Sequence, residues 1–227
     1  MADLVIKDLY EKTLDYANKT VILEGWVKTV RDSKTFGFIE LNDGSSFKNV
    51  QIVFNDKLSN FDEIAKLTIS SSIKVVGTLV ITENAKQPFE IQAESIEVEN
   101  LCPTDYPLQK KRHSFEYLRT IAHLRPRTNT FNAIFRIRSV AAFAIHEYFQ
   151  NNGYIYLNSP IITCADCEGS AEMFKLTTLD LDKPLPQKDG VTDFSEDLFG
   201  KKAFITGSGQ LHGETFSQAF GKIYTFG

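Results

Sequence analysis

The 227-residue sequence predicts an all-β barrel followed by an α+β region. Three observations support this fold class. Residues 1–100 hold five segments with the alternating apolar pattern of β-strands, interrupted by one short helical segment. After residue 129 the pattern changes to the 3.6-residue period of a long helix, followed by short apolar segments. Three prolines and many basic residues separate the two regions and indicate a hinge.

The first hundred residues are expected to form three strands, a helix and two further strands. The strands are predicted at 21–30, 36–41, 49–54, 73–81 and 89–98, and the helix at 60–67. Asn42-Asp43-Gly44 supplies a hairpin turn after the second strand. This order is that of the OB-fold, a small barrel that binds oligonucleotides across its second and third strands.

Alternation along the second and third strands assigns each side chain to one face. The predicted inward residues are Gly37, Ile39, Leu41, Val50, Ile52 and Phe54, and the predicted outward residues are Phe36, Phe38, Glu40, Asn49 and Gln51. Aromatic rings beside polar groups suit single-stranded nucleic acid, because rings stack on bases and polar groups bind base edges. In the alternative interpretation, an N-terminal helix covers this face and makes Phe36 and Phe38 core residues.

Composition narrows the class of protein. The net charge is −4 and 42% of the residues are hydrophobic, which is ordinary for a soluble globular protein. No apolar run approaches the length of a membrane helix, and the first residues lack the pattern of a signal peptide, so we expect a cytoplasmic protein. Cys164 and Cys167 form a lone C-x-x-C without further ligands nearby, and we interpret them as reduced thiols rather than a metal site.

Basic residues concentrate between positions 110 and 138. This basic block holds one acidic residue, Glu116, and eight basic ones: Lys110, Lys111, Arg112, Arg119, Arg125, Arg127, Arg136 and Arg138. Two interpretations stay open at this point. The block is a solvated linker with scattered ion pairs, or it contacts the phosphates of a nucleic acid.

The second half is expected to begin with a long helix at about 130–151. A strand at 154–157, an acidic surface loop at 180–200, a strand at 203–206, a helix at 210–220 and a strand from 223 follow. We therefore divide the chain into a barrel domain at 1–100, a basic hinge at 101–129 and an α+β domain at 130–227.

Four segments carry a resemblance to a known family. Gly153–Ile162 (GYIYLNSPII) is similar to motif 1 of the class II aminoacyl-tRNA synthetases. Tyr106–Thr128, Asp166–Phe174 (DCEGSAEMF) and Ser208–Glu214 (SGQLHGE) resemble the asparaginyl branch of the aspartyl, asparaginyl and lysyl subgroup. The resemblance implies an OB-fold anticodon-binding domain, followed by an incomplete α+β catalytic domain built on an antiparallel sheet. It also implies an asparagine–tRNA ligase that uses ATP and Mg²⁺.

The resemblance assigns anticodon-binding roles to four residues of the barrel. Phe38 would stack on an anticodon base, and Gln51 matches the glutamine that binds the central uridine. Arg31 and Glu40 would contact bases or backbone. Three of the four, Phe38, Glu40 and Gln51, belong to the outward face that alternation alone selects.

The resemblance assigns amino-acid binding to Glu168, Gln210 and Glu214. Glu168 lies in a loop that would hold the substrate ammonium group, and Gln210 would contact the bound amino acid. Glu214 would accept the amide N–H groups of asparagine and repel the carboxylate of aspartate. The aspartyl enzymes carry a lysine after the glutamine, whereas Leu211 stands there in this sequence.

Motifs 2 and 3, which supply the ATP-binding arginines of the family, have no match in the sequence. We therefore assign no catalytic residue and no metal ligand, and expect the N-terminal half of a longer enzyme that is inactive by itself. The implied partners are tRNA(Asn), L-asparagine and ATP, with a homodimer formed through motif 1. The alternatives are a non-catalytic RNA-binding OB module and an aspartyl-tRNA synthetase relative.

Overall fold

The computed structural model describes residues 4–83, 85, 87–167, 169 and 172–226. The chain divides into two compact units, Met1–Arg136 and Ile137–Gly227.

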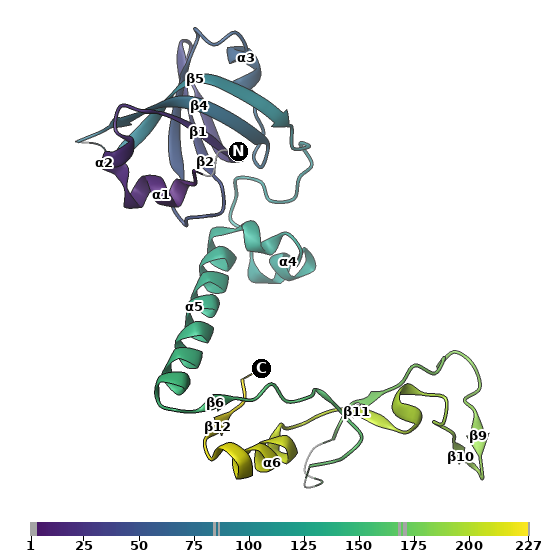
Figure 1. Ribbon diagram of the computed structural model, residues 1–227. Helices are drawn as coiled ribbons and strands as arrows, with labels where there is room; N and C mark the ends of the chain where they lie inside the picture. Colours follow the sequence, from purple (N-terminus) through teal and green to yellow (C-terminus); the bar gives the residue numbers. More distant parts are fainter. Residues whose placement is uncertain (1–3, 84, 86, 168, 170–171, 227) are drawn as a thin grey trace. The chain divides into compact units, whose positions relative to one another are not determined.

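The first unit is built on a closed five-stranded barrel (Figure 1). The strands are β1 (Thr20–Asp32), β2 (Phe36–Asn42), β3 (Val50–Asn55), β4 (Ser72–Ile81) and β5 (Phe89–Asn100). Their order around the barrel is β1-β2-β3-β5-β4, with β3 and β5 parallel and the other pairs antiparallel. This arrangement confirms the predicted OB-fold, and each strand overlaps the segment predicted for it.

The alternation predicted for β2 and β3 is confirmed. Ile39, Leu41, Ile52 and Phe54 are fully buried, and Val50 is nearly so. Gly37 leaves room for the Phe54 ring, since a Cβ there would lie 2.6 Å from Phe54 Cε1. Helix α3 (Phe61–Ile64) adds Ile64 to the core and is shorter than the predicted helix at 60–67.

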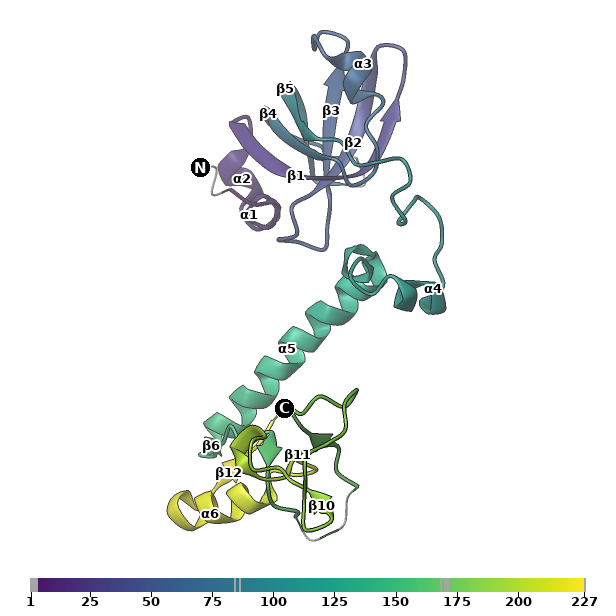
Figure 2. The ribbon, with the colours of Figure 1, turned by 90° about the vertical axis from the view of Figure 1, so that its right-hand side faces the viewer.

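Two short N-terminal helices, α1 (Ile6–Glu11) and α2 (Thr13–Tyr16), precede the barrel. Ile6 and Leu9 of α1 are fully buried in the barrel core. Figures 1 and 2 place α1 and α3 at opposite ends of the barrel. Helix α1 therefore closes one end and leaves Phe36 43% exposed, so the interpretation that a helix makes Phe36 a core residue is wrong.

The predicted hinge contains a helix that the sequence pattern did not indicate. Helix α4 (Phe115–Thr120) begins after Ser114, whose Oγ accepts a hydrogen bond from Tyr117 N at 3.2 Å. Leu118 of α4 is buried. A 3-10 turn, η1 (Arg125–Arg127), follows, and then the long helix α5 (Asn129–Asn151), which confirms the helix predicted at 130–151.

After α5, the described residues of the second unit form short strands and one further α-helix. The antiparallel sheet is β7-β11-β8, the pair β12-β6 is parallel, and β10-β9 is a hairpin. The bounds are β6 (Ile155–Tyr156), β7 (Ile162–Thr163), β8 (Lys175–Leu176), β9 (Gln187–Lys188), β10 (Val191–Thr192), η2 (Leu198–Gly200), β11 (Ala203–Ile205), α6 (Gln210–Phe220) and β12 (Ile223–Tyr224). The helix predicted at 210–220 is confirmed, and the strands are shorter than predicted.

Asp197 anchors the segment that the sequence predicts as an acidic surface loop. Its carboxylate accepts hydrogen bonds from Thr177 Oγ1 at 2.6 Å, Leu198 N at 2.7 Å, and the backbone and hydroxyl of Thr178 at 2.7 and 2.8 Å. These hydrogen bonds, above all the one from Thr177, hold the pKa of Asp197 far below its ordinary value. The loop is therefore tied to the end of β8 rather than fully solvated.

Candidate functional site

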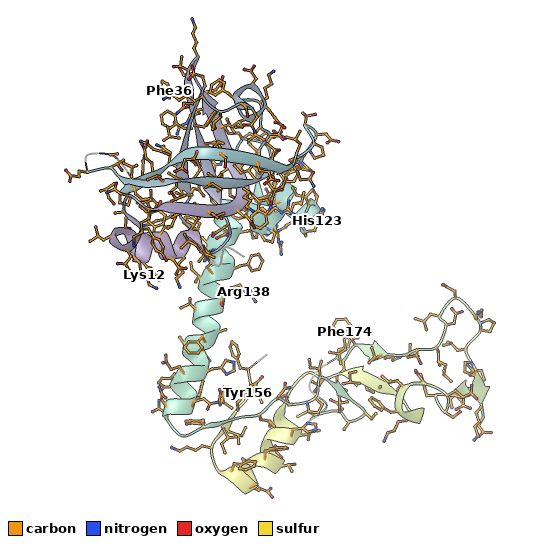
Figure 3. The ribbon with its side chains drawn as sticks, turned by 45° about the horizontal axis from the view of Figure 1, so that its top comes forward. Lys12, Phe36, His123, Arg138, Tyr156 and Phe174 are labelled. Atoms are coloured by element: carbon orange, nitrogen blue, oxygen red, sulfur yellow. The ribbon has the colours of Figure 1, made fainter. Side chains whose placement is uncertain are left out.

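Two aromatic rings lie on the outer face of β2. Phe36 and Phe38 are two residues apart on the strand, so both side chains point to the same face. Their ring centroids are 5.5 Å apart in a T-shaped arrangement. Phe36 is exposed on the outer surface of the barrel, where Figure 3 labels it, and Phe38 is half-buried. A half-buried ring braced by a second ring offers a fixed platform on which a base can stack.

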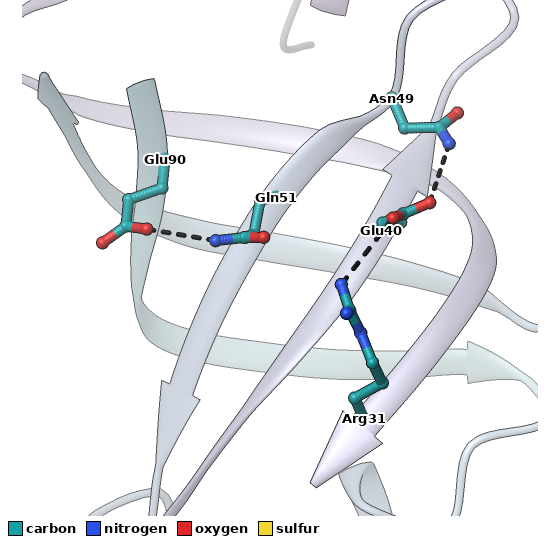
Figure 4. A network of polar contacts seen from close by, with 5 residues as sticks. All are labelled: Arg31, Glu40, Asn49, Gln51 and Glu90. Carbon is teal, nitrogen blue, oxygen red and sulfur yellow. Dashed lines mark hydrogen bonds and ion pairs between the residues drawn. The ribbon is translucent and has the colours of Figure 1, made fainter. Parts of the chain in front are cut away.

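A polar network continues this outer face across β1, β2 and the start of β3 (Figure 4). Glu40 lies at its centre. Its Oε1 is 3.9 Å from Arg31 Nη2, and its Oε2 accepts a hydrogen bond from Asn49 Nδ2 at 3.1 Å. The register explains the proximity, since Arg31 pairs with Phe38 and Glu40 pairs with Gln51. Four residues predicted to bind the anticodon, Arg31, Phe38, Glu40 and Gln51, thus lie on three adjacent strands.

Gln51 has a partner that the sequence reasoning missed. Its Nε2 donates a hydrogen bond to Glu90 Oε2 at 3.2 Å, from β3 to β5 (Figure 4). The two residues directly precede the parallel pair Ile52 and Ile91, so the register sets them side by side. The local pattern of either strand could not reveal this pairing. Gln51 and Glu90 are 39 residues apart in the sequence, and they come together only through the register of β3 against β5.

The basic block keeps its charge unpaired. Among the described residues, none of its eight basic side chains forms an ion pair. Neutral groups hold three of the arginines instead. Arg127 Nη1 donates a hydrogen bond to Tyr106 Oη at 3.1 Å, and the Arg125 guanidinium lies 4.9 Å from the centroid of the Phe131 ring. Arg136 donates hydrogen bonds to Asn132 Oδ1 and to the carbonyl of Gly44. Positioned but unneutralised guanidinium groups favour the interpretation as a phosphate-binding surface over a linker with scattered ion pairs.

Lys28 of β1 extends this positive surface within the first unit. Its Nζ donates to the Arg127 carbonyl at 3.5 Å. Burial, and then the nearby charge of Arg127, lower the pKa of Lys28. Both effects oppose the cationic form of Lys28, and the opposite charge of an anion bound beside Lys28 and Arg127 would compensate for them.

Two of the three predicted amino-acid-binding residues lie together on α6. Gln210 Nε2 donates a hydrogen bond to Glu214 Oε1 at 2.9 Å, one helical turn away. The side chain of Glu214 is exposed. Gly209, directly before α6, packs closely against Ser159, because a Cβ atom at position 209 would lie 2.8 Å from Ser159 Oγ. Glu168 lies outside the described residues. The structure therefore joins Gln210 to Glu214 and gives no position for Glu168.

The described residues include no group of three or more His, Cys, Asp or Glu side chains placed to hold a metal ion. Cys164 is exposed and Cys167 half-buried, and both are free thiols. Across the same described part of the chain, no helix has the length and apolar character needed to cross a membrane.

Two family models match the sequence in the same order as the two structural parts. The OB-fold nucleic acid binding domain matches residues 21–99, and the class II tRNA synthetases of the D, K and N group match residues 114–227. The chain therefore belongs to the class II tRNA synthetase family of the aspartate, lysine and asparagine group.

Within that family, the chain is similar to asparaginyl enzymes. It is 60% identical to the asparagine–tRNA ligase of Acetivibrio thermocellus over 228 residues, and 58% identical to that of Clostridium acetobutylicum over 227. These matches cover all of this chain and 49% of each relative, so the chain spans about half the length of the curated relatives it matches. It also resembles the crystal structure of Pyrococcus horikoshii asparaginyl-tRNA synthetase complexed with asparaginyl-adenylate. That match has a TM-score of 0.75 at 25% identity and covers 93% of this chain and 44% of that one.

Proposed function

We propose that the chain binds the anticodon arm of tRNA(Asn) and supplies the anticodon-binding domain and the first part of the catalytic domain of an asparagine–tRNA ligase. The observation that carries this proposal is the outer face of β1–β3, where Phe36 and Phe38 lie beside the Arg31–Glu40–Asn49 network. Stacking and base-edge groups on adjacent strands are the arrangement by which OB-folds bind single-stranded nucleic acid.

Each part of this face would have a separate task. Phe38 stacks on one base, while Gln51 and Glu40 bind the edges of bases that are turned out of the loop. The basic block binds phosphates without reading sequence, so it adds affinity that depends on salt. The barrel then provides the specificity for bases, and the basic block provides a large part of the affinity.

The Gln210–Glu214 pair supports a preference for asparagine over aspartate. A carboxylate only accepts hydrogen bonds, so Glu214 can bind the two N–H groups of the asparagine side chain and repels the carboxylate of aspartate. In a protein that contains this segment together with motifs 2 and 3, Glu214→Lys should shift amino-acid activation from asparagine toward aspartate. Unchanged selectivity in ATP–pyrophosphate exchange would count against this role.

ATP, Mg²⁺ and a homodimer formed through motif 1 belong to the proposal for the complete enzyme, as does a cytoplasmic location. Among the described residues, no three His, Cys, Asp or Glu side chains lie together as candidate ligands of a metal ion. We therefore assign no ATP-dependent step to these residues and expect the 227-residue chain to show no ATP–pyrophosphate exchange above background.

Binding of two tRNA(Asn) transcripts tests the proposal. One carries the anticodon GUU and the other GUC, the anticodon of tRNA(Asp), which differs only at the third position. We expect the 227-residue chain to bind the GUU transcript at least several-fold more tightly in a filter-binding assay at fixed salt. Equal affinities for both transcripts would contradict recognition of the third anticodon base and so the preference for tRNA(Asn) over tRNA(Asp).

A further inference from the structure

An open cavity of about 1320 Å³ lies between the barrel and the hinge, and all of its lining residues belong to the first unit. The barrel contributes residues of β1, β2 and neighbouring loops. The hinge contributes α4, η1 and the segment before α4. Small-molecule sites typically measure about 300–1,000 Å³, so the cavity has room for a ligand of that class.

A β-bulge in β1 determines which side chains line this cavity. The register of β1 against β2 shifts between Val27 and Thr29, so Lys28 is an extra residue on β1. Strict alternation would turn Thr29 to the face opposite Trp26, but Trp26, Lys28 and Thr29 all line the cavity. Bulges of this kind redirect side chains beside functional sites.

Aromatic rings form part of the cavity wall. Trp26 of β1 is 52% exposed, so its indole ring offers a surface on which a nucleobase can stack. Tyr106 lines the cavity from the hinge, and Arg127 holds it. Arg127 Nη1 donates a hydrogen bond to Tyr106 Oη at 3.1 Å, and its guanidinium lies 5.9 Å from the centroid of the Tyr106 ring.

Two cations meet in the cavity without an acidic partner. Lys28 is half-buried, and its Nζ lies 3.5 Å from the carbonyl oxygen of Arg127. Neither residue forms an ion pair within the described part of the chain. Burial, and then the charge of Arg127, lower the pKa of Lys28. The whole lining holds five Lys and Arg residues and two Glu residues, so it attracts anions.

The charge of the cation pair matches a terminal phosphate better than the backbone of an RNA. A terminal phosphate monoester carries about 1.5 to 2 negative charges at pH 7, whereas each phosphate of a nucleic acid backbone carries one. An RNA chain also continues on both sides of each phosphate. A terminal phosphate therefore enters the cavity and reaches the half-buried Lys28 more readily than a backbone phosphate does.

We propose that this cavity binds a free mononucleotide, with its base on Trp26 and its terminal phosphate between Lys28 and Arg127. The inference goes beyond the proposed function, since neither Phe38 nor Gln51 lines the cavity.

Trp26 is the only tryptophan of the chain, so its fluorescence reports on the cavity directly. GMP is added to the 227-residue chain at fixed salt, and the emission of Trp26 and the heat of binding are measured. We expect a saturable change in emission and a matching calorimetric Kd. Ribose 5-phosphate lacks the base and should bind about fivefold more weakly or worse in calorimetry, the scale of one stacked base.

Lys28→Gln should raise the Kd for GMP about tenfold or more, the scale of one hydrogen bond to a charged group. Lys57→Gln is the matched control, because it removes the same charge from an exposed turn after β3 that does not line the cavity. Thermal unfolding of both variants checks that the barrel is intact.

The results separate the inference from the proposed function. A GMP titration with neither heat nor a change in Trp26 emission overturns the inference, and so does a Kd that is unchanged in Lys28→Gln or raised equally in Lys57→Gln. Trp26 emission that responds to the GUU stem-loop and not to GMP also overturns it, and leaves RNA binding in place. A response to GMP in a chain that fails to bind the stem-loop supports the inference while the proposed function fails.

Discussion

Replacing Phe38 by alanine should weaken binding of the anticodon stem-loop. One base stacked on an aromatic side chain contributes about 1–3 kcal/mol. Phe38 is half-buried and offers part of its ring, while Phe36 stays in place 5.5 Å away and retains some stacking surface. We therefore expect the lower part of that range, about 1–2 kcal/mol, which raises the Kd about 5- to 30-fold.

The assay is fluorescence anisotropy with the GUU stem-loop, at a salt concentration that is the same for all variants. Phe174→Ala is the control, because Phe174 is 79% exposed and lies in the second unit. Removal of the ring-to-ring packing between Phe36 and Phe38 costs about 0.5–1.5 kcal/mol of stability, so a denaturant curve must show that Phe38→Ala remains folded. A folded Phe38→Ala variant with unchanged Kd would refute the stacking role and make Phe38 a packing residue.

Three further predictions test the core, the hinge and the loop of the second unit. Gly37→Ala places a Cβ against Phe54 and should lower the unfolding free energy by about 1–3 kcal/mol in denaturant titrations; no change would contradict the close packing. Replacing Lys110 and Lys111 by alanine should reduce the dependence of log Kd on log salt by about 0.7 for each phosphate that is no longer neutralised. An unchanged slope of log Kd against log salt would show that neither lysine contacts a phosphate of the RNA. Because the native pKa of Asp197 is depressed, its carboxylate stabilises the fold above about pH 4, its ordinary unfolded value, and that contribution disappears as the pH falls toward the native pKa. Asp197→Asn should therefore unfold more easily at neutral pH and show a shallower loss of stability below about pH 4 in thermal melts, whereas an identical pH profile would contradict the anchoring role.

The barrel could be predicted from the sequence because its signals are local. Alternation placed Ile39 and Ile52 inside and Phe36 outside, and the structure confirms all three. A β-strand carries its face assignment in a period of two residues, so five strands can be located without knowledge of their partners. The strand order then limits the possible topologies to very few.

Features that depend on distant contacts could not be predicted. The Gln51–Glu90 hydrogen bond requires the register of β3 against β5, and α1 is held by the burial of Ile6 and Leu9 in a core formed by later residues. Helix α4 was missed because six residues with one buried side chain, Leu118, give no period to detect. Ser114 was the available signal, since serine is a preferred residue at a helix N-terminus.

Backbone amide shifts in two-dimensional NMR spectra test the central claim, that the outer face of β1–β3 binds the anticodon. The GUU stem-loop is added to the ¹⁵N-labelled 227-residue chain, and the shift changes are assigned to residues. We predict the largest changes within the barrel at Arg31, Phe38 and Gln51, on three adjacent strands. Saturating RNA that leaves these three amides unmoved while shifting others would contradict the claim.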